Sequence, residues 1–306
     1  MSPATDRAPA VRLGIHLSIA RGMAAMAREA VRTGCEAVQV FTRSPRGGRA
    51  KPLDSADVAK MKETLQGADI GPLIVHTPYY VLPANDDPRI GELATQIIRE
   101  DSERAIELGA SYVVVHAGHS RQGATAATAA VARRVSAAVA ELAEAGRADE
   151  VLVLIENGAG GRGDASASLG DWAACLHGVR EAGLPIGACL DTAHLWGAGW
   201  PPGDDPVEAL VDRLCELDIA PLLRVIHLND SACAAGSGRD KHVHLGTGQI
   251  PLKTLGAILH HPAFAGLVGI VETNPANDGS AKDIALLKRL RAGRRPGPRR
   301  GPGGNG

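Results

Sequence analysis

The chain has 306 residues, 44% of them hydrophobic, a length that allows one large domain or two ordinary ones. Its net charge of −1 excludes a strongly basic protein as a whole. No apolar run reaches the ~20 residues that a bilayer-spanning helix needs, and the N-terminus lacks the apolar core of a signal peptide. The five cysteines form no C-x-x-C pair, which argues against a disulfide framework or a thiolate metal site. We therefore expect a cytoplasmic protein with no membrane partner.

The two ends differ in composition from the rest of the chain. Residues 1–10 are predicted to form a short disordered lead-in, and residues 11–290 contain no linker and are predicted to form one domain. Residues 291–306 are rich in Gly, Pro and Arg and are predicted to be a basic disordered tail. This tail could be a sequence-independent nucleic-acid arm or a solvated segment without a role, and we favour the second interpretation because basic tails are common.

Short apolar runs alternate with helical patterns along the chain. The helical segments, for example residues 22–34, 94–109 and 127–146, are rich in Ala with apolar residues at helical spacing. The apolar runs are mostly continuous, as expected for strands buried on both faces. They span residues 11–18, 36–43, 71–79, 111–119, 150–158, 185–194, 222–230 and 266–274. Eight strand-then-helix units predict an α/β protein with a single (β/α)8 TIM barrel.

The predicted strands end on polar residues of a particular kind. Active sites of such barrels lie at the C-terminal ends of the strands. A single His at such an end is usually an ordinary hydrogen-bonded residue, but seven of the eight ends carry His, Asp or Glu. In chain order they are His16, Thr42, His76, His116, Glu156, Asp191, His227 and Glu272. This pattern predicts a catalytic cluster of zinc or manganese at the C-terminal face of the barrel.

Two further pairs of metal-ligand residues follow these ends. In DTAH, Asp191 and His194 have the i, i+3 spacing that brings side chains together in the first turn of a helix. In the loop after residues 222–230, Asp240 and His242 are two apart, so an extended backbone places both on one side. The candidates number nine, and at three to four ligands per ion they suggest about three metals.

These motifs resemble one known family. HTPYY (76–80), VVVHAGH (113–119), VLIENGAG (153–160), GACLDTAHLWGAGW (187–200), RDKHVHLGTG (239–248) and VETN (271–274) look like endonuclease IV, a trinuclear zinc apurinic/apyrimidinic endonuclease with a barrel fold. GIHLS and VFTRSPR match the opening strands of that family. The resemblance covers roughly residues 11–290.

The resemblance implies three zinc ions per chain, with manganese as an alternative at one site. By this likeness one zinc is held by His76, His116 and Glu156. Glu156 bridges to a second zinc, completed by Asp191, His227 and Glu272, and the third zinc is held by His194, Asp240 and His242. Glu156 and Glu272 are the expected catalytic residues.

The resemblance also implies the reaction and the substrate. The expected activity is hydrolysis of the DNA phosphodiester 5′ to an abasic site in base excision repair, leaving a 3′-hydroxyl and a 5′-deoxyribose phosphate. The expected partner is double-stranded DNA with abasic or 3′-blocked sites, bound by a monomer that is associated with the nucleoid when it acts.

Four residues are expected to contact DNA. Arg46, Tyr79 and Tyr80 form the expected wedge where the abasic nucleotide leaves the duplex, and ordinary rim packing is the alternative for the two tyrosines. Lys241 stands where the family usually has Arg, which keeps the charge but loses bidentate phosphate geometry. Gly47 and Gly48 replace bulkier family residues in the loop that carries Arg46, which removes side chains that could contact DNA.

Two alternative functions remain open from the sequence. A xylose-isomerase-like sugar isomerase or epimerase on the same barrel needs only Glu156, Asp191, His227 and Glu272 around one metal, and it has no use for the other five ligands. The second alternative is a damaged-DNA binder that has lost catalysis, which an intact set of ligands argues against.

Overall fold

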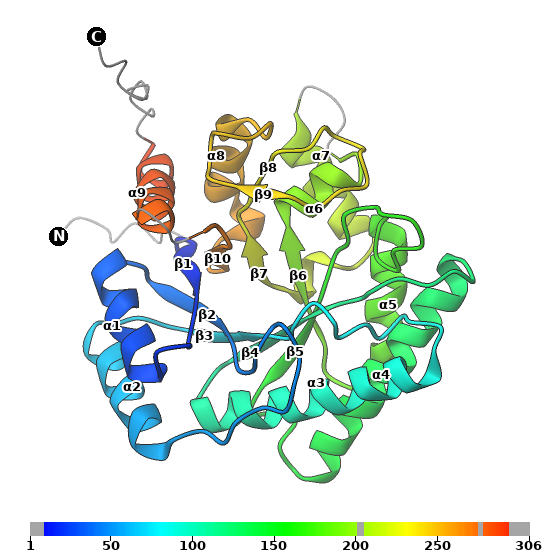
Figure 1. Cartoon of the computed structure of the whole chain (residues 1–306). Coiled ribbons are helices and arrows are strands. Elements are labelled where there is room, and N and C mark those ends of the chain that lie inside the picture. The colour runs from blue at the N-terminus through cyan, green and yellow to red at the C-terminus, as the bar shows by residue number, and fades with distance from the viewer. Residues whose placement is uncertain (1–8, 201–204, 275–277, 294–306) are drawn as a thin grey trace, which may run out of the picture.

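Eight parallel strands close into a barrel in the computed structural model, which describes residues 9–200, 205–274 and 278–293 (Figure 1). Neighbours around the barrel follow chain order, and the last strand, β10, pairs with the first. The strands are β1 (Arg12–Leu17), β2 (Ala37–Phe41), β3 (Leu73–His76), β4 (Tyr112–His116), β5 (Leu152–Glu156), β6 (Gly187–Asp191), β7 (Leu223–His227) and β10 (Val268–Val271). The predicted (β/α)8 barrel is confirmed.

Helices surround this barrel and connect its strands (Figure 1). They are α1 (Met23–Thr33), α2 (Ser55–Gly67), α3 (Pro88–Leu108), α4 (Ala124–Glu144), α5 (Leu169–Glu181), α6 (Thr192–Gly197), α7 (Pro206–Glu216), α8 (Leu252–His260) and α9 (Gly279–Arg291), with 3₁₀ turns at Ala220–Leu222 and Pro262–Phe264. Among the described residues, no helix has both the length and the apolar character required to span a bilayer.

A small antiparallel pair lies outside the barrel. β8 (Asp230–Ser231) and β9 (His242–Val243) form a two-stranded sheet that contacts α6 (Figure 1). Buried Asp230 holds this hairpin together, because its carboxylate accepts backbone N–H groups of Gly246, Gly248 and Ile250 at 2.8–3.0 Å. The hairpin brings its own polar residues back over the C-terminal ends of β6 and β7.

The interior of the barrel changes from apolar to polar along the strands. One buried cluster lies inside it and comprises Ala37, Ile74, Val114, Leu154, Cys189, Val225, Val268 and Ile270. Because side chains of a strand alternate between its two faces, the residue two positions further on also points inward. In seven strands that next inward residue is polar: Gln39, His76, His116, Glu156, Asp191, His227 and Glu272. The strand register therefore gathers the candidate ligands at one end of the barrel.

The predicted terminal segments fall largely outside the described residues. The lead-in at 1–10 is described only from Pro9, whose carbonyl accepts the N–H of Gly266 at 2.7 Å. The tail at 291–306 is described only as far as Gly293, and its first residue, Arg291, ends α9. Between these ends the barrel elements run from Arg12 to Arg291.

Candidate metal centre

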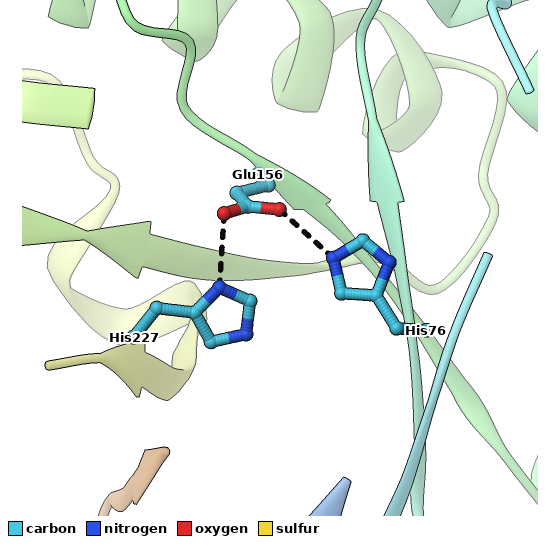
Figure 2. A group of neighbouring side chains, drawn as sticks. All are labelled: His76, Glu156 and His227. Carbon is cyan, nitrogen blue, oxygen red and sulfur yellow. Dashed lines mark hydrogen bonds and ion pairs between the residues drawn. The ribbon is translucent and has the colours of Figure 1, made fainter. Parts of the chain in front are cut away.

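Glu156 stands at the middle of the ligand cluster. It ends β5, its side chain is fully buried, and its two carboxylate oxygens face different imidazoles (Figure 2). Oε1 lies 2.9 Å from Nδ1 of His227, and Oε2 lies 3.2 Å from Nε2 of His76. Nδ1 of His116 is 3.4 Å from Oε2, and Nδ1 of His194 is 3.3 Å from Oε1. A carboxylate placed this way can bridge two cations, one at each oxygen.

A second group forms around His227. Nδ1 of His227 lies 3.3 Å from Glu272 Oε2 and 3.6 Å from Asp191 Oδ2, besides its contact with Glu156. Ligand atoms of these four residues all lie within 4.8 Å of one another. Three buried or nearly buried carboxylates at this separation repel one another unless positive charge lies between them. The group therefore has the composition and the spacing of a cation site.

A third group joins α6 to the β8–β9 hairpin. Asp191 caps α6 by accepting the backbone N–H of His194 at 2.8 Å, which fixes the two ligands of DTAH against each other. From the hairpin side, Asp240 Oδ2 lies 3.3 Å from Nε2 of His194 in α6, and Asp240 Oδ1 lies 2.9 Å from Nε2 of His242. Asp240 is half-exposed, so this group is the part of the cluster nearest to solvent.

Backbone carbonyls set the proton positions on two of the imidazoles. Nδ1 of His76 lies 2.7 Å from the carbonyl of Thr77, and Nδ1 of His194 lies 2.9 Å from the carbonyl of Asn157. A carbonyl oxygen only accepts, so each Nδ1 must carry the hydrogen. Unless the ring takes up a second proton, Nε2 is then a lone pair facing a carboxylate oxygen, a contact that needs a cation between the two atoms. The residues present therefore fit divalent metal ions.

The charges of the cluster support the same interpretation. Burial alone would raise the pKa of Glu156, but the imidazoles of His116 and His227 outweigh it and hold that pKa well below its ordinary value. Burial would lower the pKa of His194, yet Asp191 and Asp240 raise it well above the ordinary value. The carboxylates thus attract positive charge strongly, and metal ions would have to displace protons from the imidazoles to bind.

Two asparagines that the sequence did not single out support the ligands. Asn229 donates from Nδ2 to Asp191 Oδ2 at 2.7 Å and to Glu272 Oε2 at 3.1 Å, while its Oδ1 accepts the backbone N–H of Glu272. Asn157 Oδ1 accepts the backbone N–H of Asp191 at 2.7 Å. Both lie one or two residues after a candidate ligand at a strand end. Only this position in the sequence could have pointed to them as supporting residues.

The four expected DNA-contact residues lie in loops at the C-terminal end of the barrel but not in one group. Tyr79 is 66% exposed, and its ring contacts those of Phe41 and His116. Tyr80 instead packs against the core with its hydroxyl buried. Arg46 is exposed in the β2–α2 loop, and Lys241 is exposed between two candidate ligands of the hairpin.

A cavity of about 320 Å³ opens beside the cluster. Its lining includes the candidate ligands His116, His194 and Asp240 together with Tyr79 and Arg162. A larger cavity of about 700 Å³ lies between the β2–α2 loop and α3, and its lining contains none of the nine candidate ligands. We therefore take the smaller cavity as the approach to the site.

Comparison with known proteins first gives the class of barrel. Residues 27–290 match the family model described as xylose isomerase-like TIM barrel. A solved D-tagatose 3-epimerase-like protein has a TM-score of 0.67 at 18% identity, covering 92% of this chain and 97% of its own, which shows a shared fold.

More similar proteins narrow the class to one family. The protein named probable endonuclease 4 in Halothermothrix orenii is 30% identical over 283 residues, which are 92% of this chain and 99% of that protein. The crystal structure of endonuclease IV from Thermus thermophilus has a TM-score of 0.80 at 30% identity, covering 92% of this chain and 99% of its own. The chain belongs to the endonuclease IV family.

Proposed function

We propose that this protein is a metal-dependent endonuclease of DNA repair that hydrolyses the phosphodiester 5′ to an abasic site, leaving a 3′-hydroxyl and a 5′-deoxyribose phosphate. One observation carries the proposal. Nine side chains of metal-ligand type, most of them at strand ends, meet in contiguous groups around Glu156. Family membership supports DNA as the substrate. We further propose that this DNA carries abasic or 3′-blocked sites and that the protein acts as a monomer.

Three divalent ions, zinc by the chemistry of the ligands, are proposed to occupy the cluster. His76, His116 and Glu156 would hold one ion, because both rings lie within 3.4 Å of Glu156 Oε2. The other sets are Asp191, His227 and Glu272 with Glu156 as the bridge, and His194, Asp240 and His242. We also propose that manganese can replace zinc at one of these sites.

The charge of the loaded site suits an anionic substrate. Three divalent ions would bring six positive charges against the four carboxylates of the ligand set, leaving a positive focus at the end of the barrel. When bound, such ions supply Lewis-acid polarisation of the phosphodiester and lower the pKa of a water molecule to about 7. Lys241, exposed between Asp240 and His242, is placed to attract the phosphate by its point charge.

Glu272 is the proposed proton acceptor of the reaction. Its second oxygen, Oε1, is held outside the cluster by a neutral donor, Gln39 Nε2 at 2.7 Å. Its Oε2 faces the cluster, 3.3 Å from His227 Nδ1. We propose that Oε2 orients the attacking water and takes up its proton. Each carboxylate oxygen of Glu156 faces two imidazoles, so we propose that Glu156 bridges two of the ions.

Tyr79 and Arg46 are proposed to open the duplex at the lesion. Tyr79 presents a largely exposed ring beside the cavity, and Arg46 is exposed on the neighbouring loop. A nucleotide without a base loses little stacking when it swings out, so the lesion is selected without contacts to base edges. Tyr80 belongs to the same proposed wedge. Because its hydroxyl is buried, we propose that it supports the loop that carries Tyr79 and does not itself enter the duplex.

A sugar isomerase or epimerase is the second candidate, because Glu156, Asp191, His227 and Glu272 alone form one four-ligand group. Such an enzyme would have no use for the other five candidates, yet they are arranged around the same centre: His76, His116, His194, Asp240 and His242. We therefore favour the nuclease.

Cleavage of a duplex oligonucleotide carrying one stable abasic analogue tests the proposal. Wild type, Glu156→Ala and Glu181→Ala are compared, the last being an exposed carboxylate at the end of α5. A single nick 5′ to the lesion with a 3′-hydroxyl product is expected for wild type and Glu181→Ala, and none for Glu156→Ala. Failure of zinc-replete wild type to cut would overturn the proposal. Aldose–ketose conversion would then favour the isomerase, and tight lesion binding alone would favour a non-catalytic binder.

A further inference from the structure

Gln39 on β2 occupies the place that a candidate metal ligand occupies on most other strands. Its side chain points into the barrel two residues after Ala37 of the inner apolar cluster, and it is fully buried. An amide is a poor zinc ligand beside the imidazoles and carboxylates around it. An uncharged polar side chain at this depth must be hydrogen-bonded to be tolerated, so its partners indicate its role.

All hydrogen-bonding groups of the Gln39 side chain are used. Nε2 donates to Glu272 Oε1 at 2.7 Å and lies 3.0 Å from Nδ1 of His16. Oε1 lies 2.9 Å from Nε2 of His227. Glu272 and His227 belong to the same four-ligand group, so this one amide holds two ligands of one proposed ion.

The contact with Glu272 fixes which way the amide is turned. The opposite orientation would set the amide oxygen against the carboxylate at 2.7 Å, which is repulsive. With Oε1 facing His227, Nε2 of that ring must carry a hydrogen to donate. Nδ1 of the neutral ring is then a lone pair, and it is the atom that faces Glu156, Asp191 and Glu272 at 2.9–3.6 Å.

We infer that Gln39 is a positioning residue of the metal centre, which fixes the tautomer of His227 and, by holding Glu272 Oε1, turns Glu272 Oε2 into the cluster. The inference rests on the metal centre proposed above. Removing the amide leaves the His227 N–H without its acceptor and Glu272 Oε1 without its donor. Loss of a partner of this kind lowers metal affinity by about 10–100-fold in other proteins, and we expect the same here.

Zinc affinity measured against a competing chelator tests this inference in the purified full-length chain. Gln39→Leu removes both contacts at similar volume, and Ile74→Val is the matched control. Ile74 pairs in register with Gln39 and lies in the inner apolar cluster, where shortening it creates only a small cavity. Gln39→Leu should bind zinc about 10–100-fold less tightly than wild type. Ile74→Val should stay within about twofold of wild type, because it touches no ligand contact.

The imidazole ¹⁵N shifts of the zinc-loaded protein give a second measurement, which a merely structural residue would not alter. Wild type should show His227 protonated at Nε2, and Gln39→Leu should lose that signal or shift it. If the leucine variant does not fold, Gln39→Glu replaces it in the test. This variant keeps an acceptor for the His227 N–H but places a second negative charge beside Glu272. It should retain the His227 signal and still bind zinc less tightly.

The possible results distinguish the role of Gln39 from the proposed metal centre on which it rests. Wild-type zinc affinity in folded Gln39→Leu, or in Gln39→Glu where leucine is not tolerated, would refute the role of Gln39 and leave the metal centre standing. A wild-type protein that binds no zinc would refute both.

Discussion

At the scale of single residues, the gathering of the candidate ligands was predictable from the sequence, and the residues that hydrogen-bond to them were not. Five strands end on a candidate ligand, from His76 in β3 to His227 in β7, because a buried strand that finishes on His, Asp or Glu is conspicuous in sequence. Gln39 was passed over for Thr42, since only the observed register shows which residue of β2 points inward. Amides such as Asn229 carry no charge pattern, and their roles appear only through their partners.

Asn229 gives a prediction of this kind. Asn229→Ala removes the donor shared by Asp191 Oδ2 and Glu272 Oε2, so both carboxylates lose their fixed orientation. We expect kcat on an abasic duplex to fall about 10–100-fold, with reduced zinc content measured by elemental analysis. Thr254→Ala in α8, away from the cluster, serves as the control. Full zinc content and unchanged kcat in Asn229→Ala would show that the amide only fills space.

Tyr79 gives a second prediction at this scale. Its ring is largely exposed, so Tyr79→Ala should leave the melting temperature nearly unchanged while weakening binding to an abasic duplex about tenfold. Fluorescence anisotropy with lesion-containing and intact duplexes measures this. Tyr112→Phe, at the far end of β4, should bind as wild type does. Equal affinity of Tyr79→Ala and wild type for the lesion would argue that the ring is ordinary rim packing.

At the scale of elements, each barrel strand lies inside its predicted run, and the runs extend beyond it by one or more residues at either end. The excess includes residues outside the strands such as Thr42 and Thr77, whose β-branched side chains continue the composition of the strand. The β8–β9 hairpin was not predicted, since strands of two residues leave no periodicity to detect. Its candidate ligands Asp240 and His242 were still singled out, because the D-x-H spacing is local.

The β2–α2 loop, which carries Arg46, is fastened to α3 by a buried ion pair. Asp101 is fully buried, and its Oδ1 accepts from Arg43 Nε at 2.8 Å and from Thr42 Oγ1 at 2.7 Å. Asp101→Leu leaves the nearly buried Arg43 with Glu100 as its remaining partner, so we expect a loss of about 3 kcal/mol in the free energy of unfolding.

Urea denaturation measures this loss, and the exposed pair Arg213–Glu216 provides the control. Glu216→Ala should cost less than about 1 kcal/mol, because exposed pairs are screened by solvent. A cost for Asp101→Leu as small as that of Glu216→Ala would contradict the anchoring of the loop.

At the scale of the whole molecule, the last helix of the described chain is joined to the first strands where the barrel closes. Arg291 at the end of α9 donates to both oxygens of Glu36, which precedes β2, at 2.7 Å. Burial alone would raise the pKa of Glu36, but the ion pair with Arg291 outweighs it and lowers the pKa to about 2. Helix α9 is thereby held against the first strands, which sequence alone did not indicate.

This pair predicts an acid-dependent share of the stability. Since the pKa of Glu36 is lower in the folded state than its ordinary 4.5, the contribution is complete above about pH 4.5 and is lost as the pH falls toward 2. For a partly exposed carboxylate we expect about 1–2 kcal/mol. Unfolding by urea at about pH 5.5 and about pH 3.5 should therefore show a smaller pH dependence in Glu36→Gln than in wild type or Glu150→Gln. Identical pH dependence in all three would refute the contribution.

Anomalous scattering at the zinc edge, from crystals of the zinc-loaded protein, tests the central claim most directly. We predict three peaks at the C-terminal end of the barrel, one in each proposed ligand set, with Glu156 between two of them. A single peak among Glu156, Asp191, His227 and Glu272 would contradict the trinuclear centre and favour an isomerase-like site. No peak among the nine residues would refute the metal centre itself.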